Sequence, residues 1–469
     1  MLRTLFSFIL WIFLCLPISV IGQMDSVMVY NITIEGNHKT KDRIIFRELD
    51  FKKGDRISLA ELSNRIEANK RNILNTALFN RADFNIKEWD QKSNKISFLI
   101  VVEEAWYIYP IPVLELADRN FNVWWQEQNR SLNRINFGMD AYHINLTGRK
   151  DRLKVGLLFG YKQKYEIGYE IPYINKAQTI GFEASAFYSR RKEIAYKTVG
   201  NKLEFDRNDD QFQLYRFRSG ATLIYRKGLR FYHRTKLEYQ QNSISENVAD
   251  NLNPDYFLNN KRKQQLLFLR YEFIMDDRDV RPYPLSGRRF LGVVEKEGLG
   301  IFKDRNGLAF SAALEQYVRP AKKISLGVKV KGKTQVIRNM QAYTNYSALG
   351  YIDDYLRGYE LYVIDGLDYG YLQTTVRYEL FNFEWNWGKV MPIKQFRKMP
   401  ARIYLIYYND TGYVHDNQYA DQNPLGNVWL WGSGIGLDFV VYYDKIAQIQ
   451  FSRNHLGEYG IFLHQQIFF

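Results

Sequence analysis

Apolar and polar side chains alternate along many short segments between Trp106 and the last residue, Phe469. In residues 153–159 and 324–330, for example, every second residue is apolar, and most residues between them are charged, glycine or serine. This period places a different kind of side chain on each face of a strand. Repeated segments of about ten such residues are typical of strands that cross a bilayer with one face toward lipid and the other toward water.

Sixteen such segments can be placed, and an even number returns both ends of a barrel to the same side of the membrane. Tight turns are expected at residues 175–176 and 227–228, and long outer loops at 241–263 and 336–368. A large soluble sandwich is the competing fold, but it would need stronger cores on both sheets. We therefore predict an all-β transmembrane barrel of sixteen antiparallel strands over residues 105–469, with strands near 107–117, 133–147, 152–161, 164–173, 178–189, 211–226, 229–241, 264–276, 287–297, 306–319, 324–335, 369–381, 401–411, 433–443, 446–453 and 460–469.

The region before the barrel has a different pattern, which predicts a small α+β module over residues 23–104. A half-buried strand from about residue 29 is followed by a short helix at about 41–49. Ser58 and Glu61 have the spacing of a capping box that begins a longer helix. Two further strands, at 82–86 and 96–102, complete the module.

The first 22 residues read as a secretory signal. Arg3 precedes an apolar run that ends at Ile21, and Gly22 supplies a small residue before Gln23. A single helical anchor is the alternative, but Pro17 and the single basic residue favour cleavage. Cleavage would also remove Cys15, the only cysteine, which excludes a disulfide framework, a thiolate zinc site and an iron–sulfur cluster.

The composition agrees with an exported barrel. The chain carries 35 tyrosines, 31 phenylalanines and 9 tryptophans, an aromatic content typical of belts at a membrane interface. A mean hydropathy of −0.39 excludes a bundle of transmembrane helices. The formal charge of +14 favours anionic lipid headgroups as neighbours, because an exported protein does not meet nucleic acid.

Two motifs in the second half carry a family resemblance: Leu356-Arg357-Gly358-Tyr359, and the segment from Tyr408 through Asp410 to Gly412. Asp277-Arg278-Asp279 with Pro284-Leu285-Ser286-Gly287 adds a third. Together they resemble the loop and strand motifs of the outer-membrane protein 85 superfamily, in its BamA- and TamA-like surface antigen branch. The resemblance covers nearly the whole mature chain.

The first two motifs also have a physical interpretation. Asp410 shares strand parity with Arg402 and Tyr404, so its carboxylate is expected in the barrel lumen. An arginine brought in by a folded-back loop can pair with it through two hydrogen bonds, and Arg357 is the candidate. Gly358 would permit close backbone approach and Tyr359 would brace the loop. The alternative is an exposed arginine that contributes almost nothing to stability.

The first and last strands suggest a weak closure of the barrel. Pro110 and Pro112 lie in the first strand, and proline cannot donate a hydrogen bond to a strand ladder. We expect this strand to close against the last one, whose outward face is formed by Ile461, Leu463 and Phe469. A seam short of donors would favour lateral opening toward the bilayer. The alternative is that these prolines only end the connection to the N-terminal module.

The N-terminal module resembles a POTRA domain, on the basis of its element order, Ile34-Glu35-Gly36-Asn37 and Leu78-Phe79. The resemblance implies that its middle strand lies at the sheet edge and accepts an extended client segment through main-chain hydrogen bonds. The residues concerned are Asp83, Phe84, Asn85, Ile86 and Lys87. A passive spacer is the alternative, because any small α+β module leaves an edge.

The sequence indicates no enzyme, cofactor or metal site, since its six histidines are scattered and no nucleophile-elbow, Walker or zincin motif occurs. The acidic pairs Asp276-Asp277 and Asp353-Asp354 are interpreted as solvated turn residues rather than calcium ligands. The resemblance implies a BamA-type factor that assembles client proteins in the outer membrane, with its POTRA domain in the periplasm and possible periplasmic or lipoprotein accessory subunits. A secretion pore for one exported partner is the leading alternative, and a diffusion porin is a second.

Overall fold

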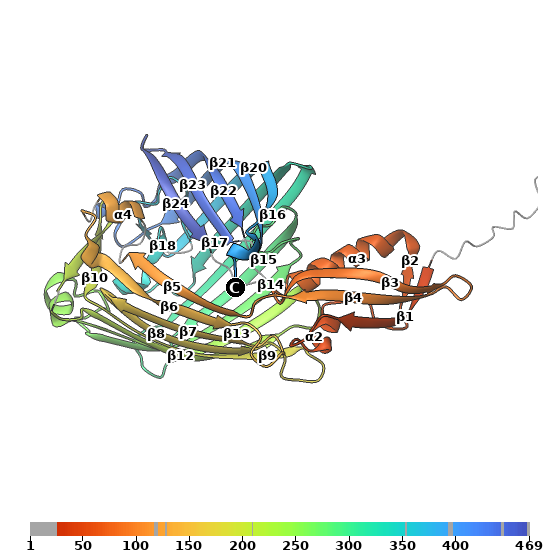
Figure 1. Ribbon diagram of the computed structural model, residues 1–469. Coiled ribbons are helices and arrows are strands. Elements are labelled where there is room, and N and C mark those ends of the chain that lie inside the picture. Colours follow the sequence, from red (N-terminus) through yellow and green to blue (C-terminus); the bar gives the residue numbers. More distant parts are fainter. Residues whose placement is uncertain are drawn as a thin grey trace, which may run out of the picture.

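The computed structural model describes residues 26–469, apart from 117–120, 127–128, 209, 352–353, 393–396, 442–444 and 467–469. The predicted signal at 1–22 and the seam residue Phe469 therefore lie outside the described residues. The chain folds into a sixteen-stranded sheet rolled into a barrel, with a smaller module at one end and structured loops at the other (Figure 1). This confirms the predicted fold class.

Each of the sixteen predicted segments corresponds to one strand of the barrel sheet, and all fifteen neighbouring pairs are antiparallel. Three strands, β20, β21 and β23, are longer at both ends than predicted, β23 by one residue at each end. The strands are β5 (Ile108–Leu116), β6 (Ile135–His143), β7 (Arg152–Gly160), β8 (Lys162–Ile171), β9 (Ile180–Arg191), β12 (Leu214–Tyr225), β13 (Phe231–Ile244), β14 (Lys263–Asp276), β15 (Gly287–Glu297), β16 (Gly307–Ala321), β17 (Ile324–Gln335), β20 (Asp368–Asn386), β21 (Lys398–His415), β22 (Trp429–Val441), β23 (Lys445–Asn454) and β24 (Tyr459–Gln466).

The two faces of the barrel wall follow the alternation of the sequence. On β17, Val328 and Val330 are 39% and 46% exposed on the outside, whereas Lys331 points inward and contacts Asp354. A wall with an apolar exterior and a polar interior is suited to a bilayer. Within the described residues, no helix is both long and apolar enough to cross a membrane.

The N-terminal module is a four-stranded sheet in the order β2-β1-β4-β3 covered by two helices. Strands β1 and β4 are parallel, and the other pairs are antiparallel. Ser58 stands at the N-cap of the longer helix, but its side chain makes no capping hydrogen bond, so the predicted capping box is wrong in detail. The elements are β1 (Ser26–Glu35), α2 (Asp42–Arg47), β2 (Arg56–Ser58), α3 (Leu59–Leu74), β3 (Phe79–Asp90) and β4 (Lys95–Glu104).

The connections at the far end of the barrel carry structure that the sequence analysis did not predict. The hairpin of β10 (Glu193–Val199) and β11 (Lys202–Arg207) leans on the 245–262 loop through a shared apolar cluster that includes Ile194, Val248 and Tyr343. Asn201 at the hairpin tip receives a hydrogen bond from Leu425 N and donates one to Val363 O. These loops pack together across the outer mouth. The other short elements are α4 (Phe121–Gln126), η1 (Leu132–Arg134), η2 (Val248–Leu252), η3 (Tyr343–Asn345), β18 (Ser347–Leu349), β19 (Ile364–Asp365), η4 (Gly388–Val390) and η6 (Ala420–Gln422).

Candidate functional site

The long loop between β17 and β20 folds back into the barrel, and Arg357 at its tip contacts Asp410 on β21. Arg357 Nε donates to Asp410 Oδ2 at 2.8 Å, Nη2 donates to Oδ1, and the main-chain N of Arg357 also donates to Oδ2 at 3.1 Å. The side chain of Asp410 is 0% exposed and that of Arg357 is 10% exposed. The structure thus brings together the two charges that the motifs single out, in a bidentate geometry.

Two further donors of the Arg357 guanidinium are also satisfied. Its Nη1 donates to Thr375 Oγ1 at 3.0 Å and its Nη2 to Thr374 O at 3.1 Å. The guanidinium carbon lies 4.2 Å from the centre of the Tyr408 ring, a distance suited to a cation–π contact. A buried ion pair is stable only when such additional contacts replace the lost hydration, and here they do.

Gly358 and Tyr359, which follow Arg357, attach the loop to two further strands. Gly358 has φ of +96°, in the left-handed region, and a Cβ there would lie 3.3 Å from Arg453 O. Asn454 Nδ2 donates to Gly358 O at 3.0 Å. The Tyr359 hydroxyl donates to Trp431 O at 2.9 Å and accepts from Trp431 N at 3.1 Å. The loop is thereby fastened to β22 and β23 as well as to β21.

Glycines on the barrel wall make room for the loop, and the sequence analysis noted only one of them. A Cβ at Gly412 would lie 2.9 Å from Leu356 Cδ1. A Cβ at Gly432 would lie 2.0 Å from Arg357 O, and one at Gly434 would meet the Tyr408 hydroxyl at 2.5 Å. The signal that could have found the last two is the run of glycines at every second position of β22, at 432, 434 and 436.

A second buried ion pair fixes the N-terminal module to the barrel. Glu48, which follows α2 and is 3% exposed, accepts two hydrogen bonds from Arg226 at 2.8 and 3.0 Å. Arg226 follows β12, and Tyr173 between β8 and β9 adds a hydroxyl to the same cluster. Arg47 donates to the main-chain oxygens of Gln178, Arg226 and Gly228. Helix α2 is therefore seated on two turns of the barrel.

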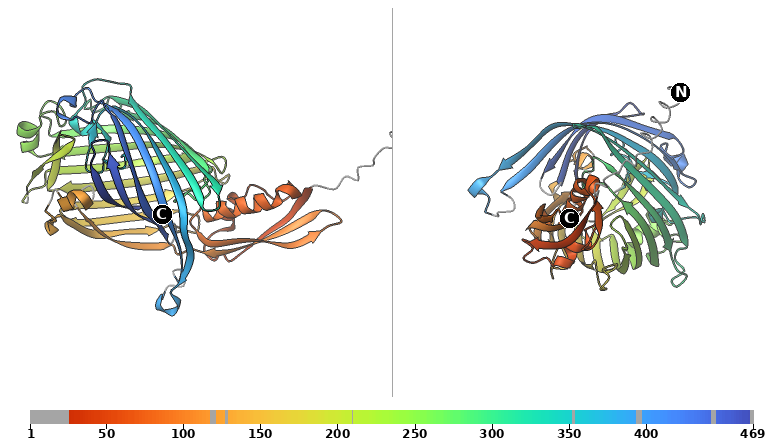
Figure 2. Two further views of the ribbon diagram at one scale, coloured as in Figure 1. Left: turned by 90° about the horizontal axis from the view of Figure 1, so that it is seen from above. Right: turned by 90° about the vertical axis from the view of Figure 1, so that its right-hand side faces the viewer.

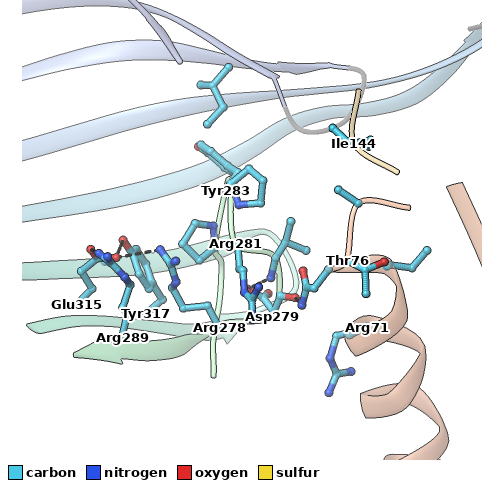
Figure 3. A pocket seen from close by; sticks show the side chains of 18 of the residues that line it. Arg71, Thr76, Ile144, Arg278, Asp279, Arg281, Tyr283, Arg289, Glu315 and Tyr317 are labelled. Atoms are coloured by element: carbon cyan, nitrogen blue, oxygen red, sulfur yellow. Dashed lines mark hydrogen bonds and ion pairs between the residues drawn. The ribbon is translucent and has the colours of Figure 1, made fainter. Parts of the chain in front are cut away.

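A cavity of about 1350 Å³ lies between the module and the lumen. Its lining includes thirteen basic and five acidic side chains, so the cavity is electropositive and favours carboxylate-bearing segments. Figure 3 shows Arg71 and Thr76 on one side and Arg278, Arg289 and Glu315 on the other. Here Arg278 binds both Asp276 and Glu315, at 2.8 and 3.1 Å.

One residue of each acidic pair, Asp276 and Asp354, is not the solvated turn residue that was predicted. Asp276 is not a solvated turn residue, because its side chain is only 8% exposed and pairs with Arg278. Asp354 is likewise engaged, by Lys331, Tyr369 and Tyr371. Asp353 lies outside the described residues. Asp276 and Asp354 serve the lumen wall, where the neighbouring arginine and lysine replace water as partners.

Strand β3, which carries Asp83 to Lys87, forms one edge of the module's sheet and within the described residues is paired only with β4. The main-chain bond from Ala105 N to Leu78 O fixes the parity, so the amides of Phe84 and Ile86 point to the open side. Beside this edge lies a groove bordered by Ile66 of α3. Asp83 itself pairs with Lys70 at 3.6 Å.

The seam residues lie at the two ends of the barrel sheet. In the described part of the chain β5 is paired in a ladder with β6 and β24 with β23, and no ladder joins β5 to β24. The bond from Ile144 N to Tyr107 O shows that odd-numbered residues of β5 bond to β6. The ring nitrogens of Pro110 and Pro112 therefore point to the open edge. On β24, Ile461 and Leu463 are exposed on the outer face.

The fold and site define a class: a transmembrane barrel of sixteen strands with a loop locked inside the lumen and one periplasmic-type α+β module. The family model of the Omp85 superfamily domain matches residues 145–439, more than half of the chain. The model described as POTRA, surface antigen variable number repeat, matches residues 27–105. The chain belongs to the Omp85 superfamily, a family of transport and membrane-assembly proteins, and carries one POTRA domain.

Solved structures with the same fold include two kinds of Omp85 protein. BamA from Haemophilus ducreyi lacking POTRA domains 1–3 is 12% identical with a TM-score of 0.51, and the match covers 94% of this chain and 83% of that one. CdiB from Escherichia coli is also 12% identical, with a TM-score of 0.56 and coverage of 94% and 74%. CdiB from Acinetobacter baumannii is 12% identical with a TM-score of 0.51, and the match covers 94% of this chain and 73% of that one. No curated protein gives a significant sequence match. At this identity the likeness concerns the fold alone.

Replacing Arg357 with alanine should lower the free energy of unfolding by about 3–5 kcal/mol, because Asp410 is left charged and unpaired inside the barrel. Asp410→Ala should have a similar effect, and the double variant should lose less than the sum of the two. Denaturant unfolding of the protein in lipid vesicles, followed by tryptophan fluorescence, measures all three.

The matched control is Arg338→Ala, which removes a similar contact with Asp368 at the outer rim, where Arg338 is 48% exposed. This change should cost at most about 1 kcal/mol. Equal losses from the Arg357 and Arg338 variants would contradict a special role for the buried pair.

The contact between the POTRA domain and the barrel should weaken in acid. Burial alone would raise the pKa of Glu48, but Lys150, Arg226 and Arg47 lower it from 4.5 to about 2. A carboxylate with a depressed pKa stabilises the docked state above about pH 4.5, and this contribution is lost as the pH falls toward 2. Spin labels at Glu61→Cys and Lys176→Cys should show a broader distance distribution at low pH.

At neutral pH, adding Glu48→Gln should broaden the same distribution, because the ion pair with Arg226 is gone. The control is Glu67→Gln on the exposed face of α3, which should leave the distances unchanged. A Glu48→Gln protein with the wild-type distribution would show that the pair does not hold the domain.

Proposed function

We propose that the protein assembles client proteins into the outer membrane as a BamA-type factor, with its POTRA domain in the periplasm. The observation that carries this proposal is the pair of sheet ends at β5 and β24, which no ladder joins within the described residues. Unpaired strand edges are templates for another strand. A nascent barrel strand offers the matching row of amides and carbonyls.

The two prolines of β5 support this use of the seam. Because the nitrogens of Pro110 and Pro112 face the open edge, each removes one donor that would otherwise bind β24. A client strand can then compete with β24 for the groups that remain on this edge. The outward-facing Ile461 and Leu463 would meet lipid at the same place.

The POTRA edge offers a first contact for the client. The outward amides of Phe84 and Ile86 can donate to an extended segment, with the groove beside Ile66 taking up its side chains. From there the electropositive cavity leads toward the lumen and the seam. The Glu48–Arg226 pair keeps this edge at a fixed position relative to the barrel.

The alternative within the same family is a pore that secretes one partner protein, since CdiB has the same fold. In that case the secreted partner would pass along the lumen and leave through the outer mouth. The Arg357 loop occupies the lumen, and the 193–207 hairpin packs with other loops across the mouth. Both features favour release at the seam over release through the pore.

Depletion of the protein, followed by quantitative proteomics of outer membranes and culture medium, tests the proposal. An assembly factor should cause a coordinated loss of several barrel proteins, whereas a secretion pore should cause the loss of one secreted protein. Complementation with Ile86→Pro, which removes one outward amide of β3, should restore assembly less well than Ile86→Ala. Unchanged levels of all barrel proteins would contradict the proposal.

Restoring the missing hydrogen-bond donors at the seam should slow the insertion of client proteins. Pro110→Val with Pro112→Val supplies two amides directed at β24, so we expect a more stable barrel and a lower rate of client insertion into vesicles. Val113→Ala is the control, because it changes a side chain of the same strand without adding an amide donor at the seam. Insertion at the wild-type rate by a stabilised double variant would separate the seam from the activity.

A further inference from the structure

The hairpin of β20 and β21 continues well beyond its neighbours in the barrel wall. The last pair of β17 with β20 is Ile324 with Tyr378, and the last pair of β21 with β22 is Arg402 with Val440. From there, within the described residues, the two strands are paired only with each other, as far as Asn386 and Lys398. We refer to the described residues 380–392 and 397–403 as the β20–β21 ribbon.

The β20–β21 ribbon has two different faces. Its pairs alternate between two faces: an apolar one with Phe381 and Ile403, Phe383 and Ala401, and Trp385 and Met399, and a mostly polar one with Asn382 and Arg402, Glu384 and Pro400, and Asn386 and Lys398. On the apolar face, Phe381 and Trp385 are 59% and 54% exposed. On the polar face, Lys398 and Glu384 form an ion pair at 3.6 Å.

The ribbon bends away from the barrel where it leaves the wall. The register of β20 with β21 shifts between Glu379 and Phe381, and a bulge of this kind bends and twists a strand pair. Both views of Figure 2 show the hairpin projecting sideways from the barrel, whereas the POTRA domain extends along the axis. A wall strand that bends outward turns its lipid-facing side toward the membrane.

Each face of the ribbon continues a surface of the barrel. The apolar face follows directly from Tyr378 and Leu405, which are exposed on the outer wall. The polar face follows from the lumen, since Glu384, Lys398 and Pro400 border the internal cavity. The apolar face is thus an extension of the surface that meets lipid, at the end of the barrel where the POTRA domain lies (Figure 2).

The charges of the ribbon also suit a phospholipid surface. The β20–β21 ribbon contains four basic residues and a single acidic one, Glu384. Basic side chains next to exposed aromatic rings are typical of segments that lie in the headgroup region, where tryptophan is also favoured. Trp385 and Trp387 lie together near the tip, with ring centres 6.0 Å apart.

We infer that the β20–β21 ribbon lies in the periplasmic leaflet of the bilayer, with its apolar face among the lipid chains and its basic residues at anionic headgroups. The inference rests on the proposed outer-membrane location of the barrel. A client polypeptide is the other occupant that such a face could take. Continuity with the lipid-facing wall favours the bilayer, because a ribbon bent in this direction meets lipid before any client arrives.

The absence of cysteine after residue 15 makes a label experiment possible. Single cysteines at Trp385 and Asn386, on opposite faces of the ribbon, carry an environment-sensitive fluorophore in the full mature chain. The protein is reconstituted into vesicles of phosphatidylethanolamine and phosphatidylglycerol. Nitroxides on the lipid chains should quench the label of Trp385→Cys strongly and that of Asn386→Cys weakly, and a water-soluble quencher should give the reverse order.

Phe383→Cys and Glu384→Cys form a second matched pair with the same expected order. Leu405→Cys, on the outer wall, reports whether the barrel itself is in the bilayer. Lipid quenching at residue 405 without any at 383 and 385 would overturn the inference about the ribbon alone. No lipid quenching at residue 405 would overturn the membrane location on which it rests.

Two further outcomes concern the nature of the occupant. A label at residue 385 that stays exposed to water in vesicles but shifts to the blue when an unfolded barrel protein is added would assign the apolar face to clients and overturn the lipid inference. A label shielded from both quenchers would assign the face to protein contacts and overturn it as well. Removing phosphatidylglycerol should reduce lipid quenching at residue 385, because the basic residues then lose their anionic partners.

Discussion

The buried contact between Arg357 and Asp410 is the interaction on which the interior of the barrel depends. A charge on either side alone would be costly in the lumen, so neither residue is tolerable without the other. The pair holds the tip of the 32-residue connection between β17 and β20 (residues 336–367) inside the barrel, and Gly412 and Gly432 leave room for that tip. The lumen thus holds a fixed loop next to the cavity, which sets this barrel apart from a simple diffusion pore.

The same principle operates where the POTRA domain meets the barrel. Glu48 and Arg226 are both almost fully buried, and each would be destabilising without its partner. A surface contact of ordinary polar residues would leave the domain free to rotate. The buried charge pair, together with Arg47 bonded to three main-chain oxygens, specifies one orientation of the domain. In that orientation the start of β3 lines the basic cavity.

The barrel was predictable because a bilayer imposes a simple rule on each strand. Alternation at residues 153–159 or 324–330 is read directly from the sequence, and so are the sixteen strand positions. The motifs that carry the family resemblance singled out Arg357 and Asp410, and strand parity placed Asp410 among the inward residues. The Glu48–Arg226 pair was not predictable, since nothing local relates a residue after α2 to a turn 178 residues later. The 193–207 hairpin was missed because its alternation includes polar residues on both faces.

The extra length of β20 and β21 was missed for a reason that bears on function. Their pattern from Phe381 to Trp385 is the same alternation as in the wall, but it continues past the point where wall partners exist. A strand pair without neighbours gains little from its main chain, so its persistence requires another source of stability. Burial of one face in lipid supplies such a source, and this explains why an aromatic face is retained on a ribbon that no described strand of the barrel covers. The outer wall, the ribbon and the seam would then all present apolar side chains to lipid.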